Sequence, residues 1–589
     1  MARPSATLIA AVACALCHGV SALGSAAGRA SMRTHARPLS SRAAVSCAAG
    51  TATLYQQDGD LAASRVSGSL AVKPGMVLSL DDGRDALVLY QRNEFSYVLL
   101  APDGGVPTEA GGSDFCVTPL EVRPGLTLNW KGERIGGPSG ATSGPKRKAF
   151  ATTLSQKERA SPRSGLLTGL TAIDALAPLG RGQSMLVIGP EDGTATELCL
   201  DLLLAQRGSG VRGIYVAMRP AEEMAALAES ASCVTVSSSS VGEFAASVAA
   251  ACTLAEIMRD AGEHVCVVVD DLQVLRSLWQ FMQATELKMY SEEGLDLGGI
   301  EESTIRDDAA GSELRTFYSS VIERAGARSA ATGGGSLTML MIVRKPSMYP
   351  DAGTSAAFPV EAFEPVVYPK ATLERVRLLA AGGVQLTSAV LAKLGISSPG
   401  SQGSSGMLAA RKHIDECISL ADGHLLLDER LVRAGVSPAI DVRASLSRIG
   451  LGKAVALRVT PMAAAIRQIA PRLRLELAVA SDTPTIAGAV MTATEQRVFA
   501  WRAVLQQPLG RPRTLAQSVL ALFCARAGYF DSLHAKSLDG ASAKAYQLVD
   551  AMVAAAPAVV ARLGPDYELS AADEAALHDA VASLQPAAA

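Results

Sequence analysis

The pattern of hydrophobic and polar positions divides most of the chain into three parts. From residue 62 to about 140, short apolar segments alternate with turns rich in Asp, Gly and Pro. This spacing is typical of a small β-barrel or sandwich. Between residues 150 and 455, short apolar runs alternate with longer helical patterns. From 456 to 589 only Ala- and Leu-rich helical periodicity is found, which predicts a helical domain.

The central part gives the clearest signals for regular structure. Its candidates for buried strands are residues 185–188, 213–216, 265–269 and 337–343. Helical stretches such as 222–232 and 241–261 lie between them. Strands that alternate with helices predict a parallel sheet with helices on both faces. The fold class predicted from the pattern is therefore a multidomain α/β protein.

The first 50 residues have the composition of a targeting presequence. Arg3 precedes an apolar stretch at 6–22 that ends in small residues, as in a secretory signal. Residues 23–50 contain several arginines and serines and no acid, as in an organellar transit peptide. A signal followed by a transit peptide predicts a plastid with extra membranes. One continuous Arg-rich presequence would instead indicate the mitochondrion.

Composition excludes several classes of protein. Apolar residues make up 49% of the 589 positions, charged residues 19%, and the formal net charge is −3. This balance argues against a disordered chain and against a nucleic-acid partner. Beyond the N-terminal stretch at 6–22, no charge-free apolar run approaches the ~20 residues of a membrane span. The ten scattered cysteines predict buried free thiols rather than a zinc or disulfide framework.

The junction between the first strand and helix of the central part is a degenerate phosphate loop. An intact loop has the pattern Gly-x-x-x-x-Gly-Lys-Ser/Thr, in which backbone amides, the lysine and a magnesium-binding hydroxyl hold the phosphates. Counted from Gly189, Thr194 replaces the second glycine, Ala195 replaces the lysine, and Thr196 is kept; Gly193 directly precedes Thr194. Two of the four elements are missing, and Glu191 and Asp192 add negative charge.

Several motifs around this junction resemble the α subunit of F-type ATP synthase. The most specific is GLLTGLTAIDALAPLGRGQ at residues 165–183. Further matches are HVCVVVDDL at 264–272, TFYSSVIERA at 316–325, GGGSLT at 333–338, ISLADGHLLLD at 418–428 and PAIDVRASLSRIG at 438–450. The resemblance implies an N-terminal β-barrel, a central P-loop-type (RecA-like) nucleotide domain with a parallel sheet, and a C-terminal helical bundle.

The resemblance also implies a ligand and its residues. ATP or ADP with Mg²⁺ would be held by the degenerate site of Gly189, Gly193, Thr194, Ala195, Thr196 and Asp270. Thr196 and Asp270, the latter in the family's Walker B strand, are the weak candidates for Mg²⁺. Since the lysine is missing, we expect binding to be weak or lost and the chain to hydrolyse no ATP alone.

Arg448 corresponds to the arginine that α subunits of this family insert into the neighbouring β subunit. Such an arginine stabilises the charge of the transition state in trans. The chain has thus lost its own phosphate loop while it retains the group that serves another subunit. The partners implied are β and γ subunits in a hetero-hexameric ring, with membrane contact only through the complex.

Two regions depart from the family pattern. An acidic loop is predicted at 290–308, where seven carboxylates stand against the single Arg306. An insertion at 344–416 contains a Gly- and Ser-rich linker sequence. Both segments favour a second hypothesis, in which the chain is a divergent paralogue that acts as a binding or assembly module outside the synthase.

The leading hypothesis is a non-catalytic α-like subunit of an organellar F-type ATP synthase that takes part in proton-driven ATP synthesis. Its expected location is the stromal side of the chloroplast thylakoid. The alternative is the matrix side of the mitochondrial inner membrane.

Overall fold

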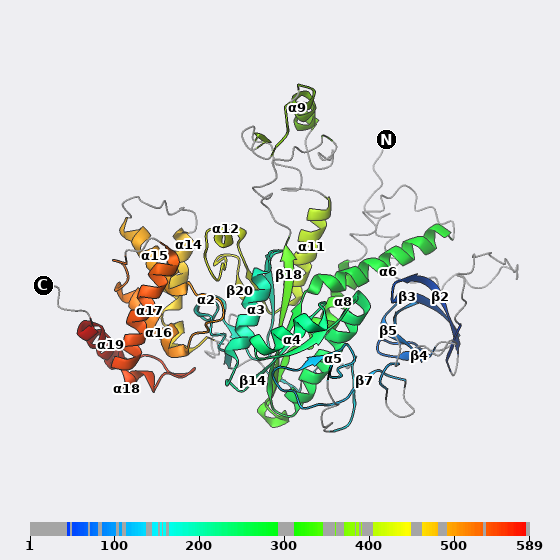
Figure 1. The fold of residues 1–589 in the computed structure, drawn as a ribbon, viewed down its shortest axis with the longest axis horizontal. Coiled ribbons are helices and arrows are strands. Elements are labelled where there is room, and N and C mark those ends of the chain that lie inside the picture. The colour runs from blue at the N-terminus through cyan, green and yellow to red at the C-terminus, as the bar shows by residue number, and fades with distance from the viewer. Residues whose placement is uncertain are drawn as a thin grey trace, which may run out of the picture.

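The computed structural model places three sets of secondary-structure elements side by side (Figure 1). The structure describes residues 44–47, 50–68, 71–79, 85–101, 105–108, 113–136, 144–150, 154–155, 157–160, 164–292, 311–345, 360, 370–382, 384–387, 390–391, 405–448, 462–480, 492–533 and 537–584. Most of the segment predicted as a presequence, most of the acidic loop and much of the insertion lie outside these residues.

The N-terminal part is a six-stranded antiparallel sheet with the order β1-β2-β3-β6-β5-β4. Its strands are β1 (Ala44–Cys47), β2 (Gly50–Asp58), β3 (Leu61–Gly68), β4 (Val77–Ser79), β5 (Asp85–Arg92) and β6 (Phe95–Leu100). The all-antiparallel pairing agrees with the strand-and-turn pattern. In the described residues, no strand pairing between β1 and β4 closes this sheet.

This sheet begins earlier in the chain than residue 62. Strand β2 pairs with β3 along its whole length, from Gly50 opposite Gly68 to Asp58 opposite Leu61. Strand β1, which pairs with β2, lies within the first 50 residues. The sequence pattern missed β2 because polar residues such as Gln56 and Gln57 interrupt its apolar positions.

The central part is built on a ten-stranded sheet with the principal order β20-β19-β13-β18-β16-β14-β15-β8. The main strands are β13 (Ser184–Pro190), β14 (Val211–Ala217), β15 (Val234–Ser237), β16 (His264–Asp270), β18 (Ser336–Lys345) and β19 (Gly423–Leu426). Neighbouring strands in this group run parallel. The predicted parallel sheet is therefore confirmed.

Shorter strands complete this sheet and its surroundings. Strand β20 (Leu446–Ser447) is antiparallel to β19, and β8 (Thr127–Leu128) is parallel to β15 at the opposite edge. The others are β7 (Cys116–Val117), β9 (Arg147–Lys148), β10 (Arg159–Ala160), β11 (Gly165–Leu166), β12 (Leu179–Gly180) and β17 (Gly326–Arg328). At two or three residues each, most are too short to produce a periodic signal.

The helices of the central part include α2 (Thr171–Leu176), α3 (Thr194–Ala205), α4 (Ala221–Ser230), α5 (Val241–Asp260), α6 (Leu272–Glu292), α8 (Gly311–Ile322), α11 (Ser405–Leu420), α12 (Glu429–Arg433) and the 3-10 turn η1 (Ala330–Thr332). Of these, α3, α4, α5, α6 and α11 pack against strands of the central sheet. Helix α6 continues through Glu292, so the acidic loop predicted from residue 290 begins later. Among the described residues, α5 alone is long and apolar enough to cross a membrane, and most of it is buried inside the protein.

The C-terminal part is helical. It comprises α13 (Ala464–Arg467), α14 (Ala470–Ala480), α15 (Ala493–Leu505), α16 (Leu515–Ala527), α17 (Leu538–Ala555), α18 (Pro557–Val560) and α19 (Ala571–Leu584). Local sequence sets where two of these begin: Thr492 and Glu495 form a capping box at α15, and Thr514 and Gln517 form one at α16. Gly528 ends α16 with a φ of 89°, which favours glycine.

Two large hydrophobic cores join the three parts. One contains residues of the N-terminal sheet such as Phe95 and Tyr97 together with residues of α5 and α6. The other joins α3 and the central sheet to C-terminal residues such as Trp501 and Phe523. Seven cysteines, at 116, 199, 233, 252, 266, 417 and 524, are free thiols and all are buried.

Candidate functional site

The degenerate phosphate loop lies between β13 and α3, at the carboxyl end of the parallel strands. Gly193 adopts a φ of 92°, and α3 begins at the next residue, Thr194. The Asp192 carboxylate accepts hydrogen bonds from the Thr194 backbone N–H (3.0 Å) and from the Thr194 hydroxyl (2.7 Å). In a working loop, such amides at a helix N-terminus face the phosphates. Here the chain's own carboxylate uses one of them.

Ala195 is buried against the strand rather than open to a ligand. A Cβ atom added at Gly189 would lie 3.0 Å from the Cβ of Ala195 and 3.2 Å from Leu427 Cδ1. This close packing explains why glycine is needed at 189 even though the loop is degenerate. Position 195 therefore supplies no charge to the site.

Thr196 and Asp270 are brought together, as expected for groups that would share a metal ion. The Thr196 hydroxyl donates to Asp270 Oδ2 at 2.7 Å, and the Tyr215 hydroxyl donates to the same oxygen at 2.5 Å. The Asp270 side chain is only 1% exposed. Burial raises the pKa of the Tyr215 hydroxyl and the adjacent Asp270 carboxylate raises it further, so Tyr215 stays a hydrogen-bond donor.

Arg344, at the end of β18, fills the remaining side of this cluster. Its Nη2 atom lies 2.6 Å from Asp270 Oδ1 and 3.3 Å from the Thr196 hydroxyl, and its Nε atom lies 2.7 Å from Asp271 Oδ2. Burial lowers the pKa of Arg344, but the two carboxylates raise it by more, so the guanidinium stays charged. Arg219 adds a second, more distant cation at 3.8 Å from Asp270 Oδ2.

These residues do not fit a magnesium nucleotide. The loop lysine is absent, the Asp192 carboxylate accepts the Thr194 amide, and the carboxylate predicted to face Mg²⁺ is already paired with Arg344. Among the described residues, no group of three or more His, Cys, Asp or Glu side chains is placed to hold a metal ion. Glu222 and Glu223, which lie near the expected position of a general base, are exposed in the first turn of α4.

Sequence reasoning missed Tyr215 and Arg344 as members of the cluster. The signal available for Arg344 was its place directly after the strand predicted at 337–343. In the structure β16 and β18 are adjacent parallel strands, and Val269 pairs with Met341. This register brings the ends of both strands to the same edge of the sheet. The adjacency itself could not be read from the sequence, since it depends on strand order.

Arg448 lies apart from this cluster, directly after the edge strand β20. Its backbone N–H donates to the Asp422 carbonyl at 2.8 Å, and its Nη1 atom lies 3.4 Å from the Ser419 carbonyl. The preceding Ser447 hydroxyl accepts a hydrogen bond from Gln183 Nε2 at 3.0 Å. The backbone is thus held firmly by the sheet while the side chain is exposed.

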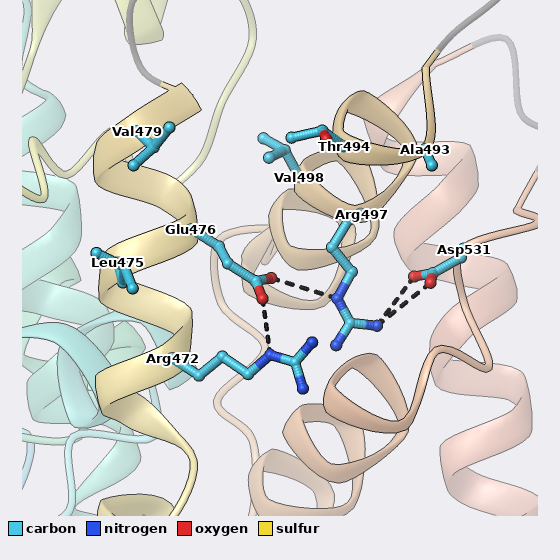
Figure 2. A pocket seen from close by; sticks show the side chains of 9 residues that line it. All are labelled: Arg472, Leu475, Glu476, Val479, Ala493, Thr494, Arg497, Val498 and Asp531. Atoms are coloured by element: carbon cyan, nitrogen blue, oxygen red, sulfur yellow. Dashed lines mark hydrogen bonds and ion pairs between the residues drawn. The ribbon is translucent and has the colours of Figure 1, made fainter.

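A cavity of about 490 Å³ lies between α14 and α15, in the C-terminal part (Figure 2). Its polar residues bind one another: Glu476 pairs with Arg472 at 2.7 Å and with Arg497 at 3.3 Å, and Arg497 also contacts Asp531. Figure 2 shows these side chains linked across the opening, with Leu475 and Val479 on the α14 wall. None of the residues predicted for the nucleotide site lines this cavity.

Comparison with known proteins defines the class of the central domain. Residues 169–348 match the model of the ATP synthase alpha/beta family, nucleotide-binding domain. This range begins within the GLLTGLTAIDALAPLGRGQ motif and includes the Thr196–Asp270–Arg344 cluster. Residues 169–348 of the central part are thus similar to the nucleotide-binding domain of that family.

Similarity to whole proteins narrows this class. ATP synthase subunit alpha of Lawsonia intracellularis is 26% identical over 485 residues, which cover 78% of this chain and 77% of that protein. The subunit of Desulfovibrio desulfuricans is 25% identical over 480 residues, with the same two coverages. That of Desulfotalea psychrophila is 26% identical over 409 residues, 65% of this chain and 63% of the relative. The chain is thus similar to ATP synthase α subunits over most of its length.

Proposed function

We propose that this chain is a non-catalytic α-like subunit of an organellar F-type ATP synthase, in a ring with β and γ subunits. Its N-terminal sheet and C-terminal helices would then correspond to the family's β-barrel and helical-bundle domains. Its part in proton-driven ATP synthesis would be structural, together with one charged group lent to a β subunit. Binding of ATP or ADP with Mg²⁺ by the chain itself would be weak or absent.

The observation that carries this proposal is the contrast between Arg448 and the chain's own site. Arg448 is an exposed cation whose backbone N–H donates to the Asp422 carbonyl and which follows Ser447, whose hydroxyl is bound by Gln183. It makes one long contact, to the Ser419 carbonyl, and has no carboxylate partner among the described residues. Asp270, by contrast, is buried and fully paired within the chain. A fixed and exposed arginine suits action on a neighbouring subunit, because little ordering is needed when the partner binds.

Affinity purification of the tagged full chain from organelles tests the assembly. We expect β and γ subunits in stoichiometric amounts. Their absence would contradict the ring and favour the divergent paralogue that acts outside the synthase. The coverage of 78% against ATP synthase α subunits favours the first outcome.

The Arg448→Ala substitution tests the catalytic contribution in the purified complex. We expect assembly to be unchanged and turnover to fall by roughly 10³-fold or more, as for other arginines that act in trans. Arg433→Ala is the matched control, since Arg433 is also exposed but pairs with Glu429 within α12. Unchanged turnover in the Arg448 variant would refute its role.

We propose the plastid as the location, with the mitochondrion as the alternative. Fusion of residues 1–50 to a fluorescent protein should direct it to one organelle. Accumulation of the fusion in the cytosol would contradict both.

A further inference from the structure

The Thr196–Asp270–Arg344 cluster places a positive charge beside a buried carboxylate, as a metal site does, but the cation is an arginine. Three adjacent elements contribute to it: Thr196 from α3, Asp270 from β16 and Arg344 from β18. The two Asp270 oxygens receive hydrogen bonds from Thr196 and Tyr215 on one side and from Arg344 on the other. Asp270 therefore has both oxygens satisfied by the chain's own donors.

A buried carboxylate needs such a partner. Transfer of an unpaired carboxylate into the protein interior is costly, whereas a carboxylate that is paired and hydrogen-bonded is tolerated. At a nucleotide site, Mg²⁺ and a lysine supply the positive charge. In this chain Ala195 supplies none, and Arg344 is the cation within hydrogen-bond distance of Asp270.

The position of Arg344 is fixed by more than its ion pairs. Gln273 Nε2 donates to the Arg344 carbonyl at 2.5 Å, which ties the end of β18 to α6. The guanidinium then spans Asp270 and Asp271, which are consecutive in sequence, and only 25% of its side chain is exposed. Mg²⁺ could reach Asp270 Oδ1 only after Arg344 had moved away.

We propose that Arg344 is a built-in replacement for the metal ion. Its guanidinium neutralises Asp270 and Asp271 and holds Thr196, so the strand ends keep one arrangement with neither Mg²⁺ nor nucleotide bound. This inference extends the proposed loss of nucleotide binding, because it states which group took over the charge.

Thermal unfolding of the purified full chain tests this role, with Mg²⁺ alone as the probe at constant ionic strength. Wild type should show no change in Tm between 0 and 5 mM Mg²⁺. Arg344→Met should lower Tm by several degrees, on the order of 5 °C, since it leaves a buried carboxylate without its cation. Mg²⁺ should restore part of this loss. Arg344→Lys, which keeps the positive charge but not the fork of donors, should lower Tm by less than Arg344→Met and show no response to Mg²⁺.

Arg328→Met is the matched control. Arg328 also binds two carboxylates, Asp260 and Glu158, but lies outside the cluster. We expect this variant to show no response to Mg²⁺. The double variant Asp270→Asn/Arg344→Met should recover part of the stability and lose the response to Mg²⁺, because Asp270, the more deeply buried of the two carboxylates that Arg344 neutralises, is removed with it.

If Arg344→Met does not fold, recovery of a folded chain in the double variant still supports the role, and failure of recovery overturns it. An Arg344→Met variant that unfolds like wild type with no response to Mg²⁺ also overturns it. The same holds for a wild-type chain stabilised by Mg²⁺ as strongly as the variant. These readouts use the isolated chain, so they fail independently of the co-purification and Arg448 experiments.

Discussion

Polar residues in this protein can be divided into those whose hydrogen-bonding groups are paired within the chain and those whose side chains are exposed. Asp270 belongs to the first kind and Arg448 to the second. The sequence named Thr196 and Asp270 as weak candidates for Mg²⁺, and in the structure the Thr196 hydroxyl donates to Asp270 Oδ2 at 2.7 Å. It did not predict Arg344 as their partner. Arg344 is 74 positions from Asp270 and 148 positions from Thr196 along the chain, and these residues meet only because of the order of strands in the sheet.

Asp174 is a buried carboxylate that makes stability depend on pH. Its Oδ1 atom accepts from the Thr168 backbone N–H at 2.9 Å and from the Thr168 hydroxyl at 2.8 Å. Burial raises its pKa to about 6, although the hydrogen bonds from Thr168 and Gly169 oppose this. In the unfolded chain the pKa is about 3.9. Between these values the native state binds more protons, so stability falls as pH rises from about 4 to about 6.

The Asp174→Asn substitution should remove this pH dependence. A raise of about two pKa units corresponds to a loss of roughly 3 kcal/mol in the free energy of unfolding of the wild type, and this loss is nearly complete above about pH 6. As pH rises from 4 to 6, the wild type should therefore lose stability relative to the variant. Chemical denaturation of both proteins across this range measures it, and a difference that does not change with pH would contradict the assignment.

At the scale of elements, long and strongly patterned segments were predictable. Helix α5 covers residues 241–260 where the sequence predicted 241–261, and β18 covers 336–345 around the predicted 337–343. Strand β2 was not predicted, because polar residues such as Gln56 and Gln57 interrupt its alternation of apolar positions. Two-residue strands such as β20 have no period of their own and form only because a longer neighbour offers backbone partners.

Two leucines of helix α14 should differ strongly in their contribution to stability, because one is buried and the other is exposed. Leu473 is fully buried, whereas Leu475, two positions later, is 67% exposed. Leu473→Ala should lower the free energy of unfolding by about 2–5 kcal/mol. Leu475→Ala should change it by no more than about 0.5 kcal/mol, as is usual for surface positions. Denaturant titration of the two variants makes this comparison, and equal effects would contradict the orientation of α14.

At the scale of the whole molecule, the three sequence-defined parts are not physically independent. Each large core crosses a boundary between parts, so burial of apolar side chains is shared between neighbours. The insertion is different. Four of its side chains, Leu373, Val376, Leu386 and Leu391, form a small cluster of their own. Figure 1 shows its helix α9 (Lys370–Ala381) standing away from the rest of the molecule.

We therefore predict that residues 352–402 can be replaced by a short Gly/Ser linker without loss of the main fold. Strand β18 and helix α11, which flank residues 352–402, pack against each other, so a short connection closes at little entropic cost. The Tm of the main transition should change by no more than about 2 °C. Val376→Asp in the intact chain should likewise leave this transition in place. A large fall in Tm for either variant would show that the insertion supports the core.

Ala195 limits how this site can change over evolutionary time. The residue is 2% exposed, and a Cβ atom on its neighbour Gly189 would lie only 3.0 Å away. A lysine introduced at 195 would enter a corner where Arg344 already balances Asp270 and where Asp192 already accepts the Thr194 amide. That substitution alone would add a surplus positive charge. Under the proposed function, a phosphate loop that binds nucleotide would require changes at 192 and 344 as well as at 195.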